Sequence, residues 1–298
     1  MTKLNGFIPA AAMLLAGAFA CGAISITASA QGMSEQAPAV GKGPAADKGA
    51  GREAFVPKEG QEGKDVIWLP TAQALVDRML DMAKMTKDDF VVDLGSGDGR
   101  TVITAARRGA QALGIEYNSK MVEFSKRNAE KAGVAERAKF QQGDIFEADF
   151  SKATVLTMFL LPDINLKLRP KILDMKPGTR VVTNSFDMGD WKADRTSTAK
   201  NNCTSYCTAY LWIVPAKVEG SWTLADGSTL KLDQTFQFIN GTLTKNGKAT
   251  AIKNGKLTGD RITFVAGKTT YNGRVAGDEI EGIPVKSKRS WKAVRRES

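Results

Sequence analysis

A short apolar segment followed by three glycines constrains the fold of this chain more than any other feature. The segment from Phe90 to Leu94 is mostly apolar, which suits a buried strand, and it is too short for a helix. Gly95, Gly97 and Gly99 follow at every second position, and residues 101–107 then have the spacing of a helix. In such a strand–turn–helix unit the glycines let the backbone approach a ligand, and the helix N-terminus offers free N–H groups. The pattern indicates a ligand site, although a tight strand–helix turn alone would use glycines too.

The spacing of these glycines separates the turn from two common nucleotide-binding motifs. Gly-x-Gly-x-Gly, preceded by Asp93, departs from the Gly-x-Gly-x-x-Gly pattern of dinucleotide folds. No Lys-Ser or Lys-Thr pair follows the glycines, as a phosphate-binding P-loop requires. The turn therefore matches neither motif and does not by itself identify a ligand.

Two further acidic residues lie where the next two predicted strands end. Residues 111–116 form a strand that ends in Glu116, where a carboxylate accepts the hydroxyls of a ribose or is merely a solvated strand end. Residues 139–146 form a third strand that closes on Gly143 and Asp144, and this second carboxylate is suited to an adenine amino group. Because these features follow successive parallel strands, they predict one ligand crevice.

These segments together resemble the class I S-adenosylmethionine-dependent methyltransferases. The residues that carry the resemblance are Asp93-Leu-Gly-Ser-Gly-Asp-Gly-Arg100, Gly114-Ile-Glu116 and Gly143-Asp-Ile-Phe146. Residues 67–71, 154–162 and 185–191 also resemble bacterial relatives of the ATP synthase c-subunit lysine methyltransferases. The resemblance implies a Rossmann-like fold, S-adenosyl-L-methionine as cofactor, methyl transfer (EC 2.1.1.-) and a protein lysine as acceptor.

The predicted crevice and the resemblance together give two groups of candidate site residues. The cofactor-binding group is Thr71, Asp93, Gly95, Ser96, Gly97, Gly99, Glu116 and Asp144. For Thr71, capping of an amphipathic helix over residues 72–84 is an equally open role. The acceptor side is expected at the end of the fourth strand, with Pro162, Asp163 and Asn165 as catalytic candidates.

Other residues near these strand ends are weaker candidates for the acceptor side. Phe159 and Leu161 belong to the same segment, and Asp187 and Asp190 follow the fifth strand. A structural role is open for each of them. No Asn/Asp-Pro-Pro-Tyr/Phe sequence is present, which lowers the case for nucleic acid bases or glutamine as acceptors.

The composition excludes several kinds of chemistry. Histidine is absent, which rules out an imidazole base, a histidine-ligated metal and a Ser-His-Asp triad. Three cysteines without a Cys-x-x-Cys pair predict no metal site. Methyl transfer from a sulfonium needs alignment and exclusion of water rather than a histidine base. The net charge of +10 is spread along the chain, so we expect solvated lysines rather than a nucleic-acid partner.

The N-terminal region is predicted to lie outside the fold. Residues 1–30 resemble a signal peptide, with an apolar stretch from Phe7 to Ile26 and a cleavage pattern at Ala28-Ser-Ala30. This predicts export to the periplasm. The alternative is an uncleaved membrane anchor, for which the basic residues after the apolar stretch favour a cytoplasmic catalytic domain. Residues 31–64 have almost no large apolar residues and predict a flexible linker.

The remaining chain is predicted to form two domains with different sequence patterns. Residues 65–216 alternate strand and helix, which indicates a mostly parallel sheet, with Pro170 as a kink or restart in one helix. Cys203 and Cys207 are predicted either to form a disulfide or to remain free thiols.

Residues 217–298 contain repeated Asn-Gly and Asp-Gly pairs between short runs in which apolar and polar residues alternate. This pattern is typical of β-hairpins. We expect an all-β barrel or sandwich of about six to eight strands, which could guide a substrate or contact a membrane. A competing hypothesis is an exported, non-catalytic binding protein that uses this β-module on a Rossmann-like scaffold.

Overall fold

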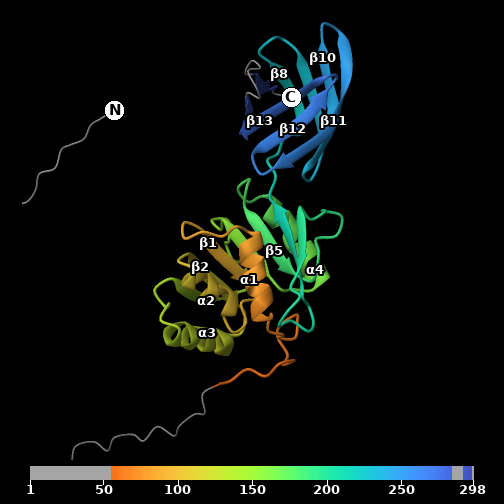
Figure 1. The fold of residues 1–298 in the computed structure, drawn as a ribbon. Coiled ribbons are helices and arrows are strands. Elements are labelled where there is room, and N and C mark those ends of the chain that lie inside the picture. The colour runs from red at the N-terminus through yellow and green to blue at the C-terminus, as the bar shows by residue number, and fades with distance from the viewer. Residues whose placement is uncertain (1–54, 284–290, 297–298) are drawn as a thin grey trace, which may run out of the picture. The chain divides into compact units, whose positions relative to one another are not determined.

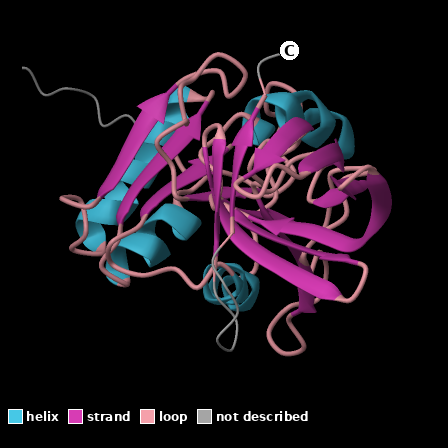
Figure 2. Ribbon diagram, turned by 90° about the horizontal axis from the view of Figure 1, so that it is seen from above, coloured by secondary structure: helices cyan, strands magenta, loops and turns pink. Residues whose placement is uncertain are grey.

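The computed structural model describes residues 55–283 and 291–296 (Figure 1). The predicted signal peptide or anchor and the greater part of the predicted linker lie outside the described residues. Within the described ranges, none of the helices has the length and apolar character needed to cross a membrane. All helices of these ranges precede residue 174, and strands are the only regular elements in the described residues after it. Figure 2 shows the helices in cyan and the strands in magenta.

A seven-stranded sheet forms the first part of the fold. Its order is β3-β2-β1-β4-β5-β7-β6, and the first five strands of this order pair in parallel. β7 runs antiparallel to both β5 and β6. The strands are β1 (Phe90–Leu94), β2 (Gln111–Glu116), β3 (Ala138–Gln142), β4 (Val155–Met158), β5 (Arg180–Asn184), β6 (Arg195–Thr198) and β7 (Thr208–Ile213). The predicted mostly parallel, Rossmann-like sheet is confirmed.

Helices cover both faces of this sheet. They are α1 (Gln73–Met82), α2 (Arg100–Arg107), α3 (Ser119–Lys131) and α4 (Pro162–Leu173). Val91 belongs to the apolar cluster that includes α1, α2 and α3, whereas its neighbour Val92 belongs to the cluster that includes α4. This follows from the alternation of side chains along a strand. Because parallel strands are buried on both faces, they appear in the sequence as continuous apolar runs.

One local prediction in this part is wrong, and one strand was not predicted. α4 continues through Pro170, so a helix restart at that residue is wrong. β6 was not predicted from the sequence. It is an edge strand with mostly exposed side chains, so it lacks the alternating apolar pattern by which strands are recognised.

The C-terminal part is a closed antiparallel barrel with the order β10-β11-β12-β13-β14-β15-β8-β9. Its strands are β8 (Gly220–Leu224), β9 (Thr229–Thr235), β10 (Phe238–Lys245), β11 (Lys248–Thr258), β12 (Arg261–Ala266), β13 (Thr269–Ala276), β14 (Glu279–Gly282) and β15 (Lys292–Arg295). Trp222 and Phe264 are fully buried in its core. The all-β prediction is confirmed, and closure distinguishes the barrel from the sandwich.

The Asn-Gly pairs of the barrel have two different roles. Asn246-Gly247 joins β10 to β11 with positive φ at both residues, as expected of a two-residue hairpin turn. Asn240-Gly241, Asn254-Gly255 and Asn272-Gly273 instead lie inside strands, so these three are not turns. A Cβ on Gly241 would lie 1.9 Å from the carbonyl oxygen of Lys231, and one on Gly255 would lie 2.2 Å from that of Ile239. At these two positions glycine permits close approach of backbones.

Candidate active site

A cavity of about 430 Å³ lies at the carboxyl ends of β1, β2 and β4. It is lined by every cofactor-binding candidate except Gly99, namely Thr71, Asp93, Gly95, Ser96, Gly97, Glu116 and Asp144. Gly99 instead caps the N-terminus of α2. The end of the sheet therefore brings the predicted residues together, as expected for ligand sites of open α/β sheets.

The glycine turn has the backbone conformation that requires glycine. Gly95, Gly97 and Gly99 have φ of 72°, 54° and 82°. A Cβ on Gly97 would lie 2.5 Å from Nε1 of Trp68. Helix α3 holds the turn in place, because the hydroxyl of its residue Ser125 donates a hydrogen bond to the Gly97 carbonyl oxygen at 2.7 Å. This arrangement keeps the backbone of the turn at the cavity wall.

Glu116 connects the end of β2 to the glycine turn. Its Oε2 accepts a hydrogen bond from Gly97 N and its Oε1 accepts one from Asn118 N, each at 3.0 Å. A carboxylate oxygen has a second acceptor site, so both oxygens retain capacity for a ligand hydroxyl. The two backbone N–H groups orient Glu116 for a pair of hydroxyls such as those of a ribose.

Asp93 is a buried carboxyl group at the end of β1. The Thr157 hydroxyl donates to its Oδ1 at 2.7 Å, and the residue is 7% exposed. Burial raises the pKa of Asp93 to about 7, although the hydrogen bond from Thr157 opposes this rise, and the neighbouring charge of Asp98 adds to it. A cationic ligand group in the cavity would favour the ionised carboxylate.

Asp144 is held by groups on both sides. Its side chain forms an ion pair with Lys64, and its Oδ1 accepts a hydrogen bond from Phe146 N. The Lys64 contact is the main reason that the pKa of Asp144 lies below its usual value. Lys64 also lies 4.8 Å from the centroid of the Tyr117 ring. An adenine at this position would thus meet a carboxylate whose geometry is already restrained.

Residues 61–70 contribute a wall of the cavity that the sequence did not predict. Gly60 N donates to Trp68 O and Trp68 N donates to Gln61 O, each at 2.9 Å, so residues 60–68 fold back on themselves. Gln61, Lys64 and Trp68 line the cavity. The signal was weak, because the first half of this segment has the composition of the linker that precedes it.

Thr71 joins this segment to the sheet. Its hydroxyl accepts a hydrogen bond from Asn184 Nδ2 at 3.2 Å, and its carbonyl oxygen accepts one from Arg100 Nη1 at 2.8 Å. Ala72, not Thr71, is the N-cap of α1, and no side chain caps that helix. The capping role considered for Thr71 is therefore wrong, and its hydroxyl lies at the cavity.

The three catalytic candidates lie outside the cavity lining. Pro162 and Asp163 are exposed at the start of α4. Asn165 is fully buried, and its Nδ2 donates to the carbonyl oxygens of Phe186 and Asp187 at 3.3 and 3.1 Å. This amide fixes the chain that follows β5, so Asn165 is placed to position Phe186.

The other acceptor candidates divide into a surface pair and a cavity pair. Asp187 is exposed and accepts a hydrogen bond from Gly189 N, while Asp190 pairs with Arg169. Phe159 and Leu161 do line the cavity. Phe186 and Tyr206, which the sequence did not single out for the acceptor side, line it as well. The acceptor end is thus aromatic and apolar rather than acidic.

This cavity fits S-adenosylmethionine in size and in chemical groups. Its volume of about 430 Å³ falls in the range of small-molecule sites. Glu116 offers acceptors for the ribose hydroxyls, Asp144 one for an adenine amino group, and Asp93 one for the ammonium of the methionine part. No group of acidic residues or cysteines suited to hold a metal occurs in the described ranges.

Gly97→Ala is expected to weaken cofactor binding at least tenfold and to lower thermal stability. The added Cβ would collide with Trp68 and would also occupy a left-handed conformation that alanine disfavours. Gly133→Ala is the matched control, because Gly133 has φ of 68° but a Cβ at this position would have no heavy atom within 4 Å. Calorimetric titration with S-adenosylmethionine compares the two variants. Equal binding by both would show that the contact with Trp68 does not shape the site.

This chain is similar to known methyltransferases. Residues 93–195 match the ANTKMT methyltransferase domain family. The chain is 41% identical over 152 residues to a protein-lysine N-methyltransferase of Saccharolobus islandicus, covering 50% of this chain and 94% of the relative. It is 33% identical to the ATP synthase c-subunit lysine N-methyltransferase of Mus musculus, covering 44% of this chain and 53% of that protein.

Among solved structures, an RNA methyltransferase from Salinibacter ruber in complex with S-adenosyl-L-homocysteine is 47% identical, with a TM-score of 0.48. The match covers 50% of this chain and 96% of that one. The match to the archaeal relative extends over almost its whole length, and this match therefore shows the family of the chain. The chain belongs to the class I S-adenosylmethionine-dependent methyltransferases, in the family related to the ATP synthase c-subunit lysine methyltransferases.

Proposed function

We propose that this methyltransferase acts on the side-chain amine of a protein lysine. The observation that carries the proposal is the acceptor end of the cavity, where Phe159, Phe186 and Tyr206 line the same space as Asp93 and Glu116. An aromatic and apolar opening suits the long alkyl chain and the amine of lysine. The names of the archaeal and mouse relatives point to the same acceptor class.

The chain contributes alignment and desolvation to this reaction. S-adenosylmethionine supplies a methyl group on a sulfonium, which is lost readily to a nucleophile in line with the sulfur–carbon bond. Glu116 and Asp144 orient the nucleoside, and Asp93 orients the methionine part. The apolar side chains of Leu160 and Ile164 line the cavity and exclude water. Desolvation favours the neutral amine over the ammonium, so the nucleophilic form is available without a histidine base.

A labelling experiment tests the proposal. The purified protein is incubated with S-adenosylmethionine that carries a tritiated methyl group and with a nuclease-treated cell extract. We expect label in protein, recovered as methyllysine after acid hydrolysis, and no transfer above background with Glu116→Gln. Binding of the cofactor without any methyllysine, or label found in a parallel RNA sample instead, would contradict a lysine acceptor.

We propose also that the folded part works outside the reducing cytoplasm. Support comes from the disulfide between Cys203 and Cys207, since such bonds persist mainly in oxidising compartments, and from the cleavage pattern at Ala28-Ser-Ala30. Fractionation of the tagged protein in a bacterial host tests this. Soluble periplasmic protein with blocked thiols is the expected result. Protein that stays cytoplasmic with two free thiols would refute it.

A further inference from the structure

Three aromatic rings from separate parts of the chain meet at the acceptor end of the cavity. Phe159 follows β4, Phe186 follows β5, and Tyr206 lies between β6 and β7. The ring centroids of Phe159 and Phe186 are 6.2 Å apart, and Tyr206 lies 5.3 Å from the first and 6.0 Å from the second. All three residues line the cavity. We call these three residues the aromatic wall.

Phe186 is held in the wall by buried polar groups. Its carbonyl oxygen accepts hydrogen bonds from Asn165 Nδ2 and from the Thr183 hydroxyl. Ser185, directly before it, has φ of 59°, which a non-glycine residue adopts rarely. Side chains that are fully buried thus fix an unusual backbone turn, and the turn directs the ring of Phe186 to the cavity.

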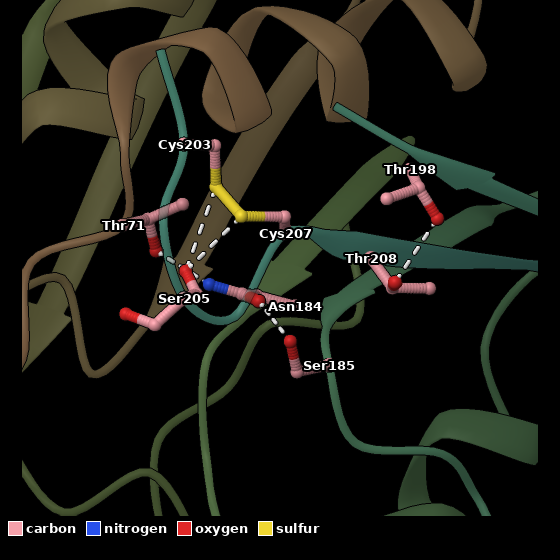
Figure 3. Close-up of a disulfide and its surroundings, with 8 residues drawn as sticks. All are labelled: Thr71, Asn184, Ser185, Thr198, Cys203, Ser205, Cys207 and Thr208. Atoms are coloured by element: carbon pink, nitrogen blue, oxygen red, sulfur yellow. Dashed lines mark hydrogen bonds between the residues drawn. A yellow bond between two sulfur atoms is a disulfide. The ribbon is translucent and has the colours of Figure 1, made fainter. Parts of the chain in front are cut away.

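Tyr206 is held differently, by a covalent loop. Cys203 and Cys207 form a disulfide, and both sulfur atoms lie close to the carbonyl oxygen of Ser205 (Figure 3). Figure 3 shows this loop beside Thr71, which forms part of the cavity wall, and beside Asn184, which supports Thr71 through a hydrogen bond. Cys203 also packs against the apolar cluster that contains α1. The loop is therefore tied to the folded core at the end next to the cofactor site.

We expect the backbone of this loop to change its conformation when the disulfide is removed. Asn202 and Tyr206 have φ of 55° and 53°, and Tyr206 is 45% exposed. Left-handed conformations at such residues persist where the surrounding structure imposes them. An exposed tyrosine has few packing contacts for this purpose, so the disulfide is the element that keeps Tyr206 against Phe159 and Phe186.

We propose that the aromatic wall is the subsite for the methylammonium group that forms on the acceptor lysine when its neutral amine takes the methyl group, and that the Cys203–Cys207 disulfide positions Tyr206 within it. The inference rests on the proposed lysine acceptor. Aromatic faces attract ammonium groups, and the attraction is strongest when the cation is poorly hydrated. Each added methyl group reduces hydration, so the wall retains the methylated amine better than the unmethylated one. Such a subsite supports successive methylation of one lysine when the methylammonium releases its proton to water and S-adenosylhomocysteine is exchanged for S-adenosylmethionine before each further transfer.

A pair of small probes separates the cation effect from simple apolar packing. One probe is Nα-acetyl-Nε-trimethyllysine amide, and the other is its neutral isostere with carbon in place of the quaternary nitrogen. Affinities are measured by NMR titration of the full chain saturated with S-adenosylhomocysteine. We expect the cation to bind roughly fivefold tighter than the isostere. Equal binding of the two probes would overturn the assignment of the wall as an ammonium subsite.

Substitutions then test Tyr206 and the disulfide. Tyr206→Ala should remove most of the preference for the cation, and Tyr206→Phe should keep it because the ring remains. Cys203→Ser combined with Cys207→Ser should lower the preference as much as Tyr206→Ala does. An unchanged preference in the double variant would refute the positioning role of the disulfide. Phe238→Ala, which removes a 44% exposed ring that does not line the cavity, is the matched control.

Cofactor binding keeps this test separate from the test of the proposed function. The probes are compared on protein saturated with S-adenosylhomocysteine, so a change of cofactor affinity in a variant does not enter the comparison. Methyllysine formed by a chain that shows no preference for the cationic probe would refute the aromatic subsite and leave the lysine acceptor intact. A preference without any methyllysine in proteins would refute the lysine acceptor instead.

Discussion

Glu116→Gln is expected to lower the affinity for S-adenosylmethionine roughly 100-fold, equivalent to about 3 kcal/mol. The two oxygens of Glu116 accept hydrogen bonds from the N–H groups of Gly97 and Asn118. In glutamine one of these oxygens becomes an NH₂ group, which would face a backbone N–H as donor against donor. The same change removes a negative charge and an acceptor for a ribose hydroxyl. Both the glycine turn and the ligand therefore lose a partner.

Calorimetric titration of the folded variant measures this loss. Glu136→Gln is the control, because it makes the same chemical change at an exposed position that does not line the cavity. Thermal melting of each variant shows whether the fold is kept. A folded Glu116→Gln protein that binds the cofactor normally would mean that Glu116 serves only to hold the Gly97 turn.

The cofactor side could be predicted because its residues belong to local patterns at strand ends. The glycine turn follows directly from β1, and Glu116 ends β2. Parallel strands bring such ends to one edge of a sheet, so short-range patterns in the sequence became a single cavity. This is why residues as distant along the chain as Asp93 and Asp144 could be grouped by their sequence patterns alone.

The acceptor side could not be predicted in the same way, because it depends on packing between distant segments. Asn165 has the polar character of a catalytic group, yet its amide is used to hold the backbone at Phe186. Tyr206 lies in a polar loop without periodicity, and it reaches the cavity because the loop is closed by a disulfide.

In the barrel, Asn-Gly pairs in the sequence indicate turns, but three of these pairs lie inside strands.

Asp93→Asn is expected to stabilise the cofactor-free protein at pH 8 while weakening cofactor binding. Burial raises the pKa of Asp93 to about 7 from its ordinary value of 3.8, so the folded state binds the proton more tightly than the unfolded state does. Stability is therefore lost as pH rises from about 4 to about 7, by on the order of 4 kcal/mol, and the loss is complete above that range. Asparagine avoids the buried charge and can still accept the hydrogen bond from Thr157.

Asp89→Asn is the control with the opposite sign. The pKa of Asp89 is lowered even though burial alone would raise it, because the N–H of Thr86, the hydroxyl of Thr154 and the guanidinium of Arg180 stabilise the carboxylate. Its stabilising effect is present above the unfolded pKa and is lost as pH falls, so Asp89→Asn should destabilise the protein at pH 8.

Chemical denaturation from pH 4.5 to 8.5 measures the free energy of unfolding of the three proteins. At high pH we expect Asp93→Asn to be more stable than the unmodified chain and Asp89→Asn to be less stable. The stabilisation by Asp93→Asn should disappear toward pH 4.5. Affinity for S-adenosylmethionine should rise through pH 7 in the unmodified chain, because the ionised Asp93 is the form that attracts the ammonium of the cofactor, and this rise should be absent in Asp93→Asn. A variant that is less stable than the unmodified chain at both ends of the pH range would show that Asp93 is needed for folding. A buried carboxylate that costs stability and whose ionisation strengthens binding belongs to the site rather than to the core.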